Sequence, residues 1–552
     1  MKRDPGGWQL RLDQEMIESY TRLGVWSNQT LADLARTAAA CDPARVTHVF
    51  EGRPYEIGRL LADAETLAAN LQARGLRTGD VVSFQLPNWI EAFLIDLAAS
   101  MLGLVVAPIV PIYREAEAAY MLADCGAKVA FVPGEYRGYD YLSMMRRLAK
   151  QLPQLQEIVS VRVGNPVANN NAHSRFESLV ANGAQLREVP NIDPNAVKLM
   201  LYTSGTTGKP KAVLHSHNTM AYTVRAAGAH WDLRPSDTML MASPVTHITG
   251  FGAGLEMPLL CNVRTVFMER WDAAEGVTLI EREKVSISMG ATPFLQELLD
   301  EAQRRASRLP SLRLYACGGA AVPPALIRRA HSDLDRCRAF RVFGSSEVPL
   351  TTLGFVGAGQ LDLAAETDGE VVHYEVRVLD DEGRELSPGQ EGELAVRGPA
   401  MFLGYADPAQ TAGSFDADGY FLTGDVGHLT PQRAIVVTGR KKDLINRGGE
   451  KISAKEVEDL LHQHPSIAEA AVVAIPHARL GETVAAYAVL VPGATLEFEE
   501  LIRHISAAGV ARQKHPERLF IVDTFPRTAS GKIRKDQLRI DARERLRRET
   551  HP

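Results

Sequence analysis

The sequence predicts an α/β protein with a large N-terminal domain of layered βαβ sheets, a small β-barrel-like subdomain and an α+β C-terminal domain. Over most of the first 440 residues, short runs rich in β-branched residues alternate with helical patterns, which indicates parallel sheets. From residue 391 short alternating strands and turns dominate. After residue 442 a compact mixture of helical and strand-like runs follows.

The N-terminal elements follow from local composition. Asn88 is a typical N-cap residue, so we expect a helix from there to Met101. The apolar run at 97–110 is too short to span a bilayer, and we interpret it as a buried helix that leads into a strand. Strands are expected at residues 81–86, 105–107, 129–132 and 158–161.

The later elements lie on either side of a charged segment. A cluster of charge at 440–443, between two apolar runs, predicts a domain boundary. Strands are expected before it at 392–396, 420–422 and 435–437. After it, helices are expected at 454–462 and 496–507, and strands at 470–475, 484–490 and 518–522.

Composition narrows the class of protein. The chain has 552 residues, 45% of them hydrophobic and 23% charged, as in ordinary globular proteins. Its formal net charge of −6 argues against a broad electrostatic surface for nucleic acid. The five cysteines form no Cys-x-x-Cys pair, so neither a disulfide framework nor a zinc site is indicated. The first 14 residues lack the apolar core of a secretory signal, so we expect a cytoplasmic protein without a transmembrane segment. The sequence leaves open whether the protein forms a homodimer.

The most informative segment is residues 202–211, which read YTSGTTGKPK between two apolar runs. Glycines let a backbone approach a ligand closely, and hydroxyls and lysines suit phosphate oxygens. The segment is not a P-loop, because that motif would require glycine where Thr203 stands and a hydroxyl where Pro210 stands. A polar surface turn between two strands is the alternative interpretation. The two lysines that flank Pro210 favour a nucleotide-binding loop.

Four further segments carry chemical groups. Glu347 follows a Gly/Ser turn, Asp425 follows a strand-like run, and a basic cluster at 439–443 leads into residues 447–451. A basic loop that contains glycine spans residues 526–535. Taken singly, each is more typical of a solvated turn than of a site.

In this order and at these separations, the segments resemble those of the acyl-adenylate-forming (AMP-binding) superfamily of acyl-CoA synthetases, aryl-CoA ligases, adenylation domains and luciferases. The resemblance covers nearly the whole chain. It implies an N-terminal ATP- and acyl-binding domain at 1–439, a hinge at 440–442 and a mobile C-terminal domain at 443–552.

The resemblance also implies how ATP is bound. Thr203, Ser204, Gly205, Thr206, Thr207, Gly208 and Lys209 are similar to the loop that holds the β- and γ-phosphates. Gly318, Gly319 and Ala320, together with Phe343, Gly344, Ser345 and Ser346, resemble the walls against adenine, where the family usually has tyrosine at 343 and threonine at 346. Asp425 and Arg440 match the residues beside the ribose, and Glu347 and Thr207 are the implied Mg²⁺ ligands.

The remaining roles concern the acid and the thiol. Lys532 matches the lysine between carboxylate and α-phosphate, where two anions must join and positive charge is needed. His247 matches the position beside the acyl carboxylate, although a core histidine is the alternative. Lys442 matches the hinge, Gly448 and Gly449 would lie along the channel for coenzyme A, and Lys451 would contact phosphate or be a solvated charge.

Three functions are compatible with this resemblance. The first is an acyl-CoA synthetase, with ATP, Mg²⁺ and coenzyme A as cofactors and partners. The second is a stand-alone enzyme that loads a separate carrier protein, and the third is a sensor without turnover. The intact Lys532, Glu347 and Asp425 argue against the third. We expect the acid pocket to be lined by residues 247–254, 318–322 and 345–352. These segments carry no fixed charge beyond His247 and Glu347, so we expect an apolar acid. Residues 110–115 and 131–135 are similar to cyclohexanecarboxylate-type and fatty-acid CoA ligases.

Overall fold

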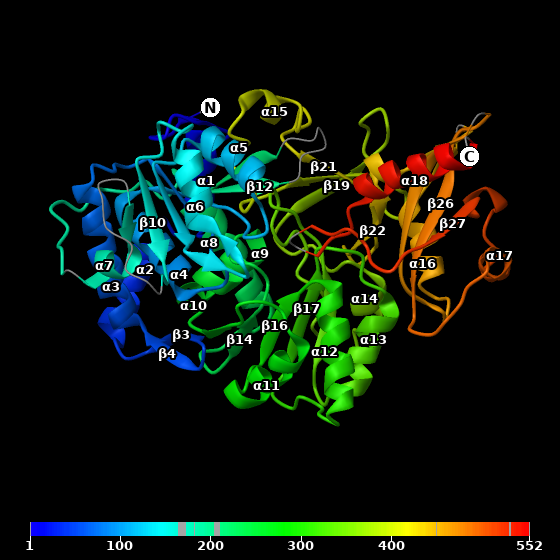
Figure 1. Cartoon of the computed structure of the whole chain (residues 1–552), viewed down its shortest axis with the longest axis horizontal. Coiled ribbons are helices and arrows are strands. Elements are labelled where there is room, and N and C mark those ends of the chain that lie inside the picture. The colour runs from blue at the N-terminus through cyan, green and yellow to red at the C-terminus, as the bar shows by residue number, and fades with distance from the viewer. Residues whose placement is uncertain are drawn as a thin grey trace.

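The protein is described here from a computed structural model that covers residues 2–163, 173–181, 183–203, 210–448, 450–477, 479–528 and 531–550. Two seven-stranded sheets dominate its N-terminal part (Figure 1). In the first sheet every neighbouring pair is parallel except β12–β13. Its order is β11 (His173–Arg175), β10 (Glu157–Val161), β7 (Val129–Pro133), β5 (Val81–Phe84), β6 (Val105–Pro108), β12 (Val197–Thr203) and β13 (Lys211–Ser216).

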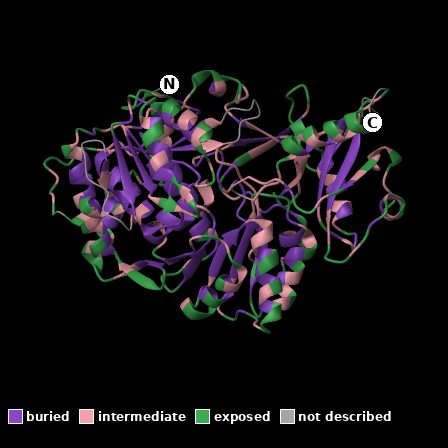
Figure 2. Cartoon of the chain, viewed as in Figure 1, coloured by how far each residue is buried: buried purple, intermediate pink, exposed green. Residues whose placement is uncertain are grey.

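The second sheet is parallel apart from the edge pair β3–β4. Its order is β18 (Arg338–Val342), β17 (Leu314–Gly318), β16 (Ile287–Gly290), β14 (Thr238–Met241), β15 (Arg264–Phe267), β3 (Val46–Phe50) and β4 (Arg53–Glu56). The strands of both sheets are largely buried, whereas the outer faces of the helices are exposed (Figure 2). The expected parallel sheets are therefore confirmed.

Helices cover the two sheets. Those near the first sheet and between the sheets are α2 (Leu31–Cys41), α3 (Ile57–Ala73), α4 (Ile90–Leu102), α5 (Glu115–Cys125), α6 (Tyr141–Ala149), α7 (Phe176–Ala181) and α8 (His217–His230). Those packed along the second sheet are α11 (Ala273–Glu283), α12 (Thr292–Arg304), α13 (Pro324–Asp333) and α14 (Leu361–Glu366). Smaller elements are β1 (Lys2–Arg3), β2 (Gln9–Leu10), α1 (Gln14–Arg22), β8 (Glu135–Tyr136), β9 (Tyr139–Asp140) and α15 (Pro408–Ala412).

The apolar run at 97–110 is the end of α4 followed by β6, as expected. The prediction that Asn88 caps this helix is wrong. The helix begins at Ile90 with Trp89 at its N-cap. The Asn88 side chain instead donates to the carbonyls of Ser243 and Met268 and accepts from the backbone N–H of Val245, at 2.8–3.1 Å. Asn88 is buried, and these long-range bonds satisfy its polar atoms better than a cap would.

A four-stranded antiparallel sheet follows, where the small β subdomain was expected. It consists of β19 (Glu375–Leu379), β20 (Gly392–Arg397), β21 (Phe421–Leu429) and β22 (Ile435–Arg440). A short 3-10 turn at Lys441–Asp443 then leads to the C-terminal part of the chain.

The C-terminal part lies at one end of the molecule, beyond this sheet (Figure 1). Its five strands and three helices are β23 (Ile445–Arg447), β24 (Glu450–Ile452), α16 (Ala454–Leu461), β25 (Ile467–His477), β26 (Gly481–Leu490), α17 (Phe498–Ala507), β27 (Arg518–Ile521) and α18 (Lys535–Thr550). Among the described residues, its two apolar clusters draw members from residue 445 onward alone. No helix in the described ranges is long and apolar enough to cross a bilayer.

Candidate active site

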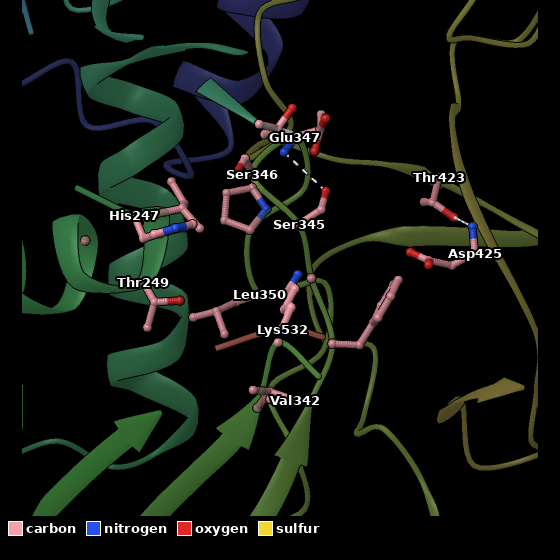
Figure 3. A pocket seen from close by; sticks show the side chains of 18 of the residues that line it. His247, Thr249, Val342, Ser345, Ser346, Glu347, Leu350, Thr423, Asp425 and Lys532 are labelled. Carbon is pink, nitrogen blue, oxygen red and sulfur yellow. Dashed lines mark hydrogen bonds between the residues drawn. The ribbon is translucent and has the colours of Figure 1, made fainter. Parts of the chain in front are cut away.

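One large cavity, of about 840 Å³, lies where the carboxyl ends of β16, β17 and β18 meet β12, β21 and the C-terminal part. Carboxyl ends of parallel strands are the usual place for ligands in α/β sheets. Lys532 enters this cavity from the C-terminal loop, between His247 on one side and Asp425 on the other (Figure 3). The cavity is therefore built from both parts of the chain.

The two residues that flank the predicted phosphate loop lie at this cavity. Thr203 ends β12, Lys211 begins β13, and the two residues are paired in the antiparallel register. Both line the cavity, and the Lys211 ammonium lies 4.7 Å from the centre of the Tyr405 ring. Ser204, Gly205, Thr206, Thr207, Gly208 and Lys209 lie outside the described residues.

A tight turn after β18 forms the next wall, and all of its predicted residues, Phe343 to Glu347, line the cavity. A Cβ at Gly344 would lie 2.5 Å from the backbone nitrogen of Leu350, so only glycine fits there. Ser345 Oγ accepts from the backbone N–H of Glu347 at 3.2 Å and holds the turn. Gly318 and Gly319 also line the cavity, whereas Ala320 is exposed and does not.

Two side chains outside these motifs support the turn. The Tyr405 hydroxyl donates to Glu347 Oε1 at 2.9 Å. His215 Nε2 donates to the Ser346 carbonyl at 2.7 Å, and burial lowers the pKa of His215 to about 4, so the ring is neutral. Glu347 is thus oriented while its second oxygen can still accept from a ligand.

Asp425 and Arg440 form an ion pair on the opposite wall, at 2.8 Å between Arg440 Nε and Asp425 Oδ1. They are directly paired in the β21–β22 register, so the sheet itself sets the contact. Burial raises the pKa of Asp425, and Arg440 opposes that shift. Asp425 also receives support from Thr423, whose Oγ1 accepts from its backbone N–H at 3.1 Å.

Lys532 is the cation between these walls. Burial and the neighbouring Arg440 lower its pKa to about 8 from 10.5, while Asp425 and Glu347 oppose the shift. The pKa of His247 falls to about 4 because of burial and of the charge of Lys532, so His247 is neutral at pH 7. The site therefore places a buried cation, Lys532, whose charge its surroundings disfavour, beside an uncharged histidine.

An apolar branch of the cavity extends between α8, α10 (Met257–Leu260) and the second sheet. Its residues are Met220, Thr223, Val224, Gly252, Ala253, Met257, Met289 and Phe294. The Thr223 hydroxyl is occupied, since it donates to the Thr219 carbonyl at 3.3 Å. The branch therefore offers mostly apolar contact.

Comparison with known families agrees with this geometry. The model of the AMP-binding enzyme family matches residues 35–406, and that of the AMP-binding enzyme C-terminal domain matches residues 456–532. The chain belongs to the AMP-binding enzyme family. It is therefore an enzyme of the adenylate-forming acyl- and aryl-CoA ligase group, and ATP is its nucleotide.

Several relatives of the AMP-binding family span nearly the whole chain. A medium-chain fatty-acid–CoA ligase of Escherichia coli (strain K12) is 36% identical and is matched over 97% of this chain and 94% of its own length. A 2,3-dihydroxybenzoate-AMP ligase of Bacillus subtilis (strain 168) is 32% identical over 96% and 97%. The crystal structure of ATP-bound MatB from Rhodopseudomonas palustris superimposes with a TM-score of 0.82 at 26% identity, over 93% and 99%.

Some predicted residues lie away from the cavity. Lys442 lines it, in the 3-10 turn, but Gly448 does not. Gly448 follows β23 in the β23–β24 hairpin, has a φ of 64°, and its backbone N–H donates to the Leu480 carbonyl at 2.8 Å. Gly449 and the side chain of Lys451 lie outside the described residues.

Sequence reasoning missed the residues that reach the site from a distance. Tyr405 arrives through a bridge to Val213, and the apolar residues of α8 and β16 belong to no quoted motif. The spacing of Met220, Thr223 and Val224, which puts them on one helix face, is the signal that was available.

Proposed function

We propose that this protein is an ATP-dependent acyl-CoA synthetase that converts an apolar carboxylic acid to an acyl adenylate and then to a thioester. The observation that carries the proposal is Lys532, a cation of lowered pKa within a cavity that also contains the Asp425–Arg440 pair and Glu347. Both reactants of the first step are anions, and this arrangement supplies charge where they would meet.

In this proposal ATP lies across the mouth of the cavity. The loop that runs from Thr203 to Lys211 would hold the β- and γ-phosphates, and the ribose hydroxyls would donate to Asp425. Gly318, Gly319 and the Phe343 turn would contact adenine. The Asp425–Arg440 pair supports this pose, because Arg440 fixes the buried carboxylate and opposes the rise of its pKa that burial causes.

Mg²⁺ fits the donor set at Glu347. A magnesium ion that accompanies ATP is typically held by one or two carboxylates and the phosphates, rather than by a cage of protein ligands. Glu347 provides one such carboxylate, oriented by Tyr405. Thr207 is the second proposed ligand. The ion would supply charge neutralisation at the phosphates.

The first half-reaction needs position and charge. One carboxylate oxygen of the acid attacks the α-phosphorus of ATP, the bond to the bridging oxygen breaks, and pyrophosphate leaves. Lys532 would bridge the incoming carboxylate and the α-phosphate and reduce their repulsion. His247, neutral beside the carboxylate, would donate one hydrogen bond without adding charge.

In the second half-reaction the thiolate of coenzyme A attacks the acyl carbon and AMP leaves. Lys532 would obstruct that approach, so we propose that the domain at 443–552 rotates against the domain at 1–439 about the hinge at 440–442, with Lys442 as the pivot. Gly448 and Gly449 would then line the channel for the pantetheine arm, and Lys451 would contact phosphate.

We propose an aliphatic or alicyclic acid, because the apolar branch of the cavity, called the acyl branch from here on, is lined mainly by methionines, valine, one phenylalanine and small residues. Methionines adapt to irregular apolar shapes. A substrate with several hydroxyls would leave them unpaired in this branch. The free cysteines among the described residues fit a reducing compartment, and we propose a cytoplasmic enzyme of fatty-acid metabolism.

A panel experiment tests this function. Purified enzyme is given ATP, Mg²⁺ and each of a series of aliphatic, alicyclic and aromatic acids, and pyrophosphate release is followed. Coenzyme A or a phosphopantetheinylated carrier protein is then offered, and the thioester is identified by mass spectrometry. If none of these acids supports pyrophosphate release, adenylate formation is refuted. The resemblance to an AMP ligase supports carrier loading as the second candidate, and transfer to the carrier alone would favour it.

A further inference from the structure

The wall of the acyl branch contains a π-helical turn at Phe251–Glu256, between α9 (Ile248–Gly250) and α10. Single π-turns are rare in proteins, and those that do occur are often found at functional sites. All six residues are buried. Gly252 and Ala253 within the turn, and Met257 just after it, line the acyl branch. The geometry of this turn therefore sets the positions of three pocket residues.

The middle of the turn is held from the second sheet. His48 on β3 lies with Nε2 3.3 Å from the Gly254 carbonyl, and Thr47 Oγ1 lies 3.0 Å from its Nδ1. Because a carbonyl only accepts, Nε2 carries the proton and the hydroxyl donates to Nδ1. Gly254 is confined as well, since a Cβ there would lie 3.1 Å from Met241 and from Phe267.

The end of the turn is held by a buried ionic cluster. The Glu256 carboxylate forms a short contact with Lys198 on β12, and Lys198 lies 3.1 Å from Asp96 on α4. The side chains of Lys198, Asp96 and Glu256 are only 3%, 0% and 3% exposed. None of the three lines the cavity. The proposed reaction does not use this cluster, and buried ions are costly unless they are paired.

The cluster of Asp96, Lys198 and Glu256 favours a π-turn over an α-turn at this position. A π-turn contains one more residue than the α-helical path, and each residue advances a helix by about 100°. In an α-helical register the carboxylate at position 256 would rotate away from Lys198 and leave charges unpaired in the core. In the π register Glu256 is paired with Lys198, so this ion pair favours that register.

We infer that Asp96, Lys198 and Glu256 are positioning residues that fix the shape of the acyl branch and thereby the length of acid that the enzyme prefers. This inference rests on the proposed function of the cavity. It concerns acids whose tails extend to Gly252, Ala253 and Met257. Short acids, which reach only the carboxylate end near His247, should be insensitive to the cluster.

Glu256→Gln is the first test, with Asp237→Asn as the matched control. Asp237 is likewise a buried carboxylate, 7% exposed and 2.6 Å from Arg313, but it lies outside the cavity. The readout is kcat/KM in pyrophosphate release for the longest and the shortest straight-chain acids that the wild-type enzyme activates. We expect the long-to-short ratio to fall at least tenfold in Glu256→Gln, with an unchanged KM for ATP, and to stay within twofold in the control.

If folded Glu256→Gln has a long-to-short ratio of kcat/KM within twofold of wild type, the inference is overturned, and the cluster has only a structural role. If that variant does not fold, the triple variant Asp96→Asn, Lys198→Met, Glu256→Gln takes its place, because it leaves no unpaired charge in the core. The same fall in the ratio is expected. An unchanged ratio, or a triple variant that cannot fold, would contradict selective control of the pocket. Wild-type enzyme that releases no pyrophosphate with any acid would instead refute the proposed function.

Discussion

Replacing Lys532 with alanine should separate the two half-reactions. The lysine carries the charge that faces both anionic reactants, and its surroundings already disfavour that charge: a pKa lowered from 10.5 to about 8 corresponds to about 3 kcal/mol. Opposite unit charges about 4 Å apart near a protein surface interact by about 4 kcal/mol. We therefore expect adenylation to slow by about 10³-fold or more.

The assay measures each half-reaction alone. Pyrophosphate exchange with ATP and the preferred acid reports adenylation, and thioester formation from synthetic acyl adenylate and coenzyme A reports the second step. Lys532→Ala should lose the first and keep the second within a few-fold. Lys441→Ala is the matched control, because Lys441 lines the cavity but is paired with Glu393 at 2.7 Å. Equal loss in both half-reactions would refute the role assigned to Lys532.

Three more predictions follow from the same site. Asp425→Ala should raise the KM for ATP by about 30-fold, since hydrogen bonds to a charged acceptor contribute about 1.5–3 kcal/mol each; an unchanged ATP titration would contradict ribose contact. Tyr405→Phe should raise the KM for Mg-ATP several-fold while that for the acid holds, because Glu347 loses a partner at 2.9 Å; equal changes in both constants would argue against this. Finally, kcat/KM for the acid should be maximal below about pH 7 and fall as pH rises through about 8, where Lys532 loses its proton; a rate that stays flat to pH 10 would exclude Lys532 as the titrating cation.

Motif order and strand periodicity were enough to predict the layered sheets and several residues that line the cavity. Phe343 to Glu347 and the Asp425–Arg440 pair belong to local sequence patterns, and each pattern positions its own side chains. Asn88 was assigned wrongly because its partners, Ser243 and Met268, are more than 150 residues away in sequence. Long-range partners of this kind follow from tertiary packing rather than from local propensity.

The acyl side of the cavity depends almost wholly on such packing. Met220 and Met289 reach it from different layers of the fold, and no local pattern relates them. The sequence around Glu256 gives no sign of a π-turn, and its contact with Lys198 is one of the tertiary contacts that constrain this turn. The proposed specificity for the acid thus depends on tertiary contacts, whereas the proposed ATP site is built from residues within local motifs.

The proposed rotation of the C-terminal domain depends on the contacts between that domain and the rest of the chain. Among the described residues, the apolar clusters of that domain contain no member from before residue 445, so a rotation would not expose a shared core. The contacts that reach across are polar, such as the Ser453 hydroxyl, which donates to the Thr438 carbonyl, and Lys532 in the cavity. Polar contacts can be exchanged for water at small net cost, whereas separating an apolar interface costs about 25 cal/mol per Å². In the proposed mechanism, Lys532 on a domain attached in this way would leave once pyrophosphate has gone and its own anionic partners have been lost. This physical link is why we expect adenylation itself to prepare the second half-reaction.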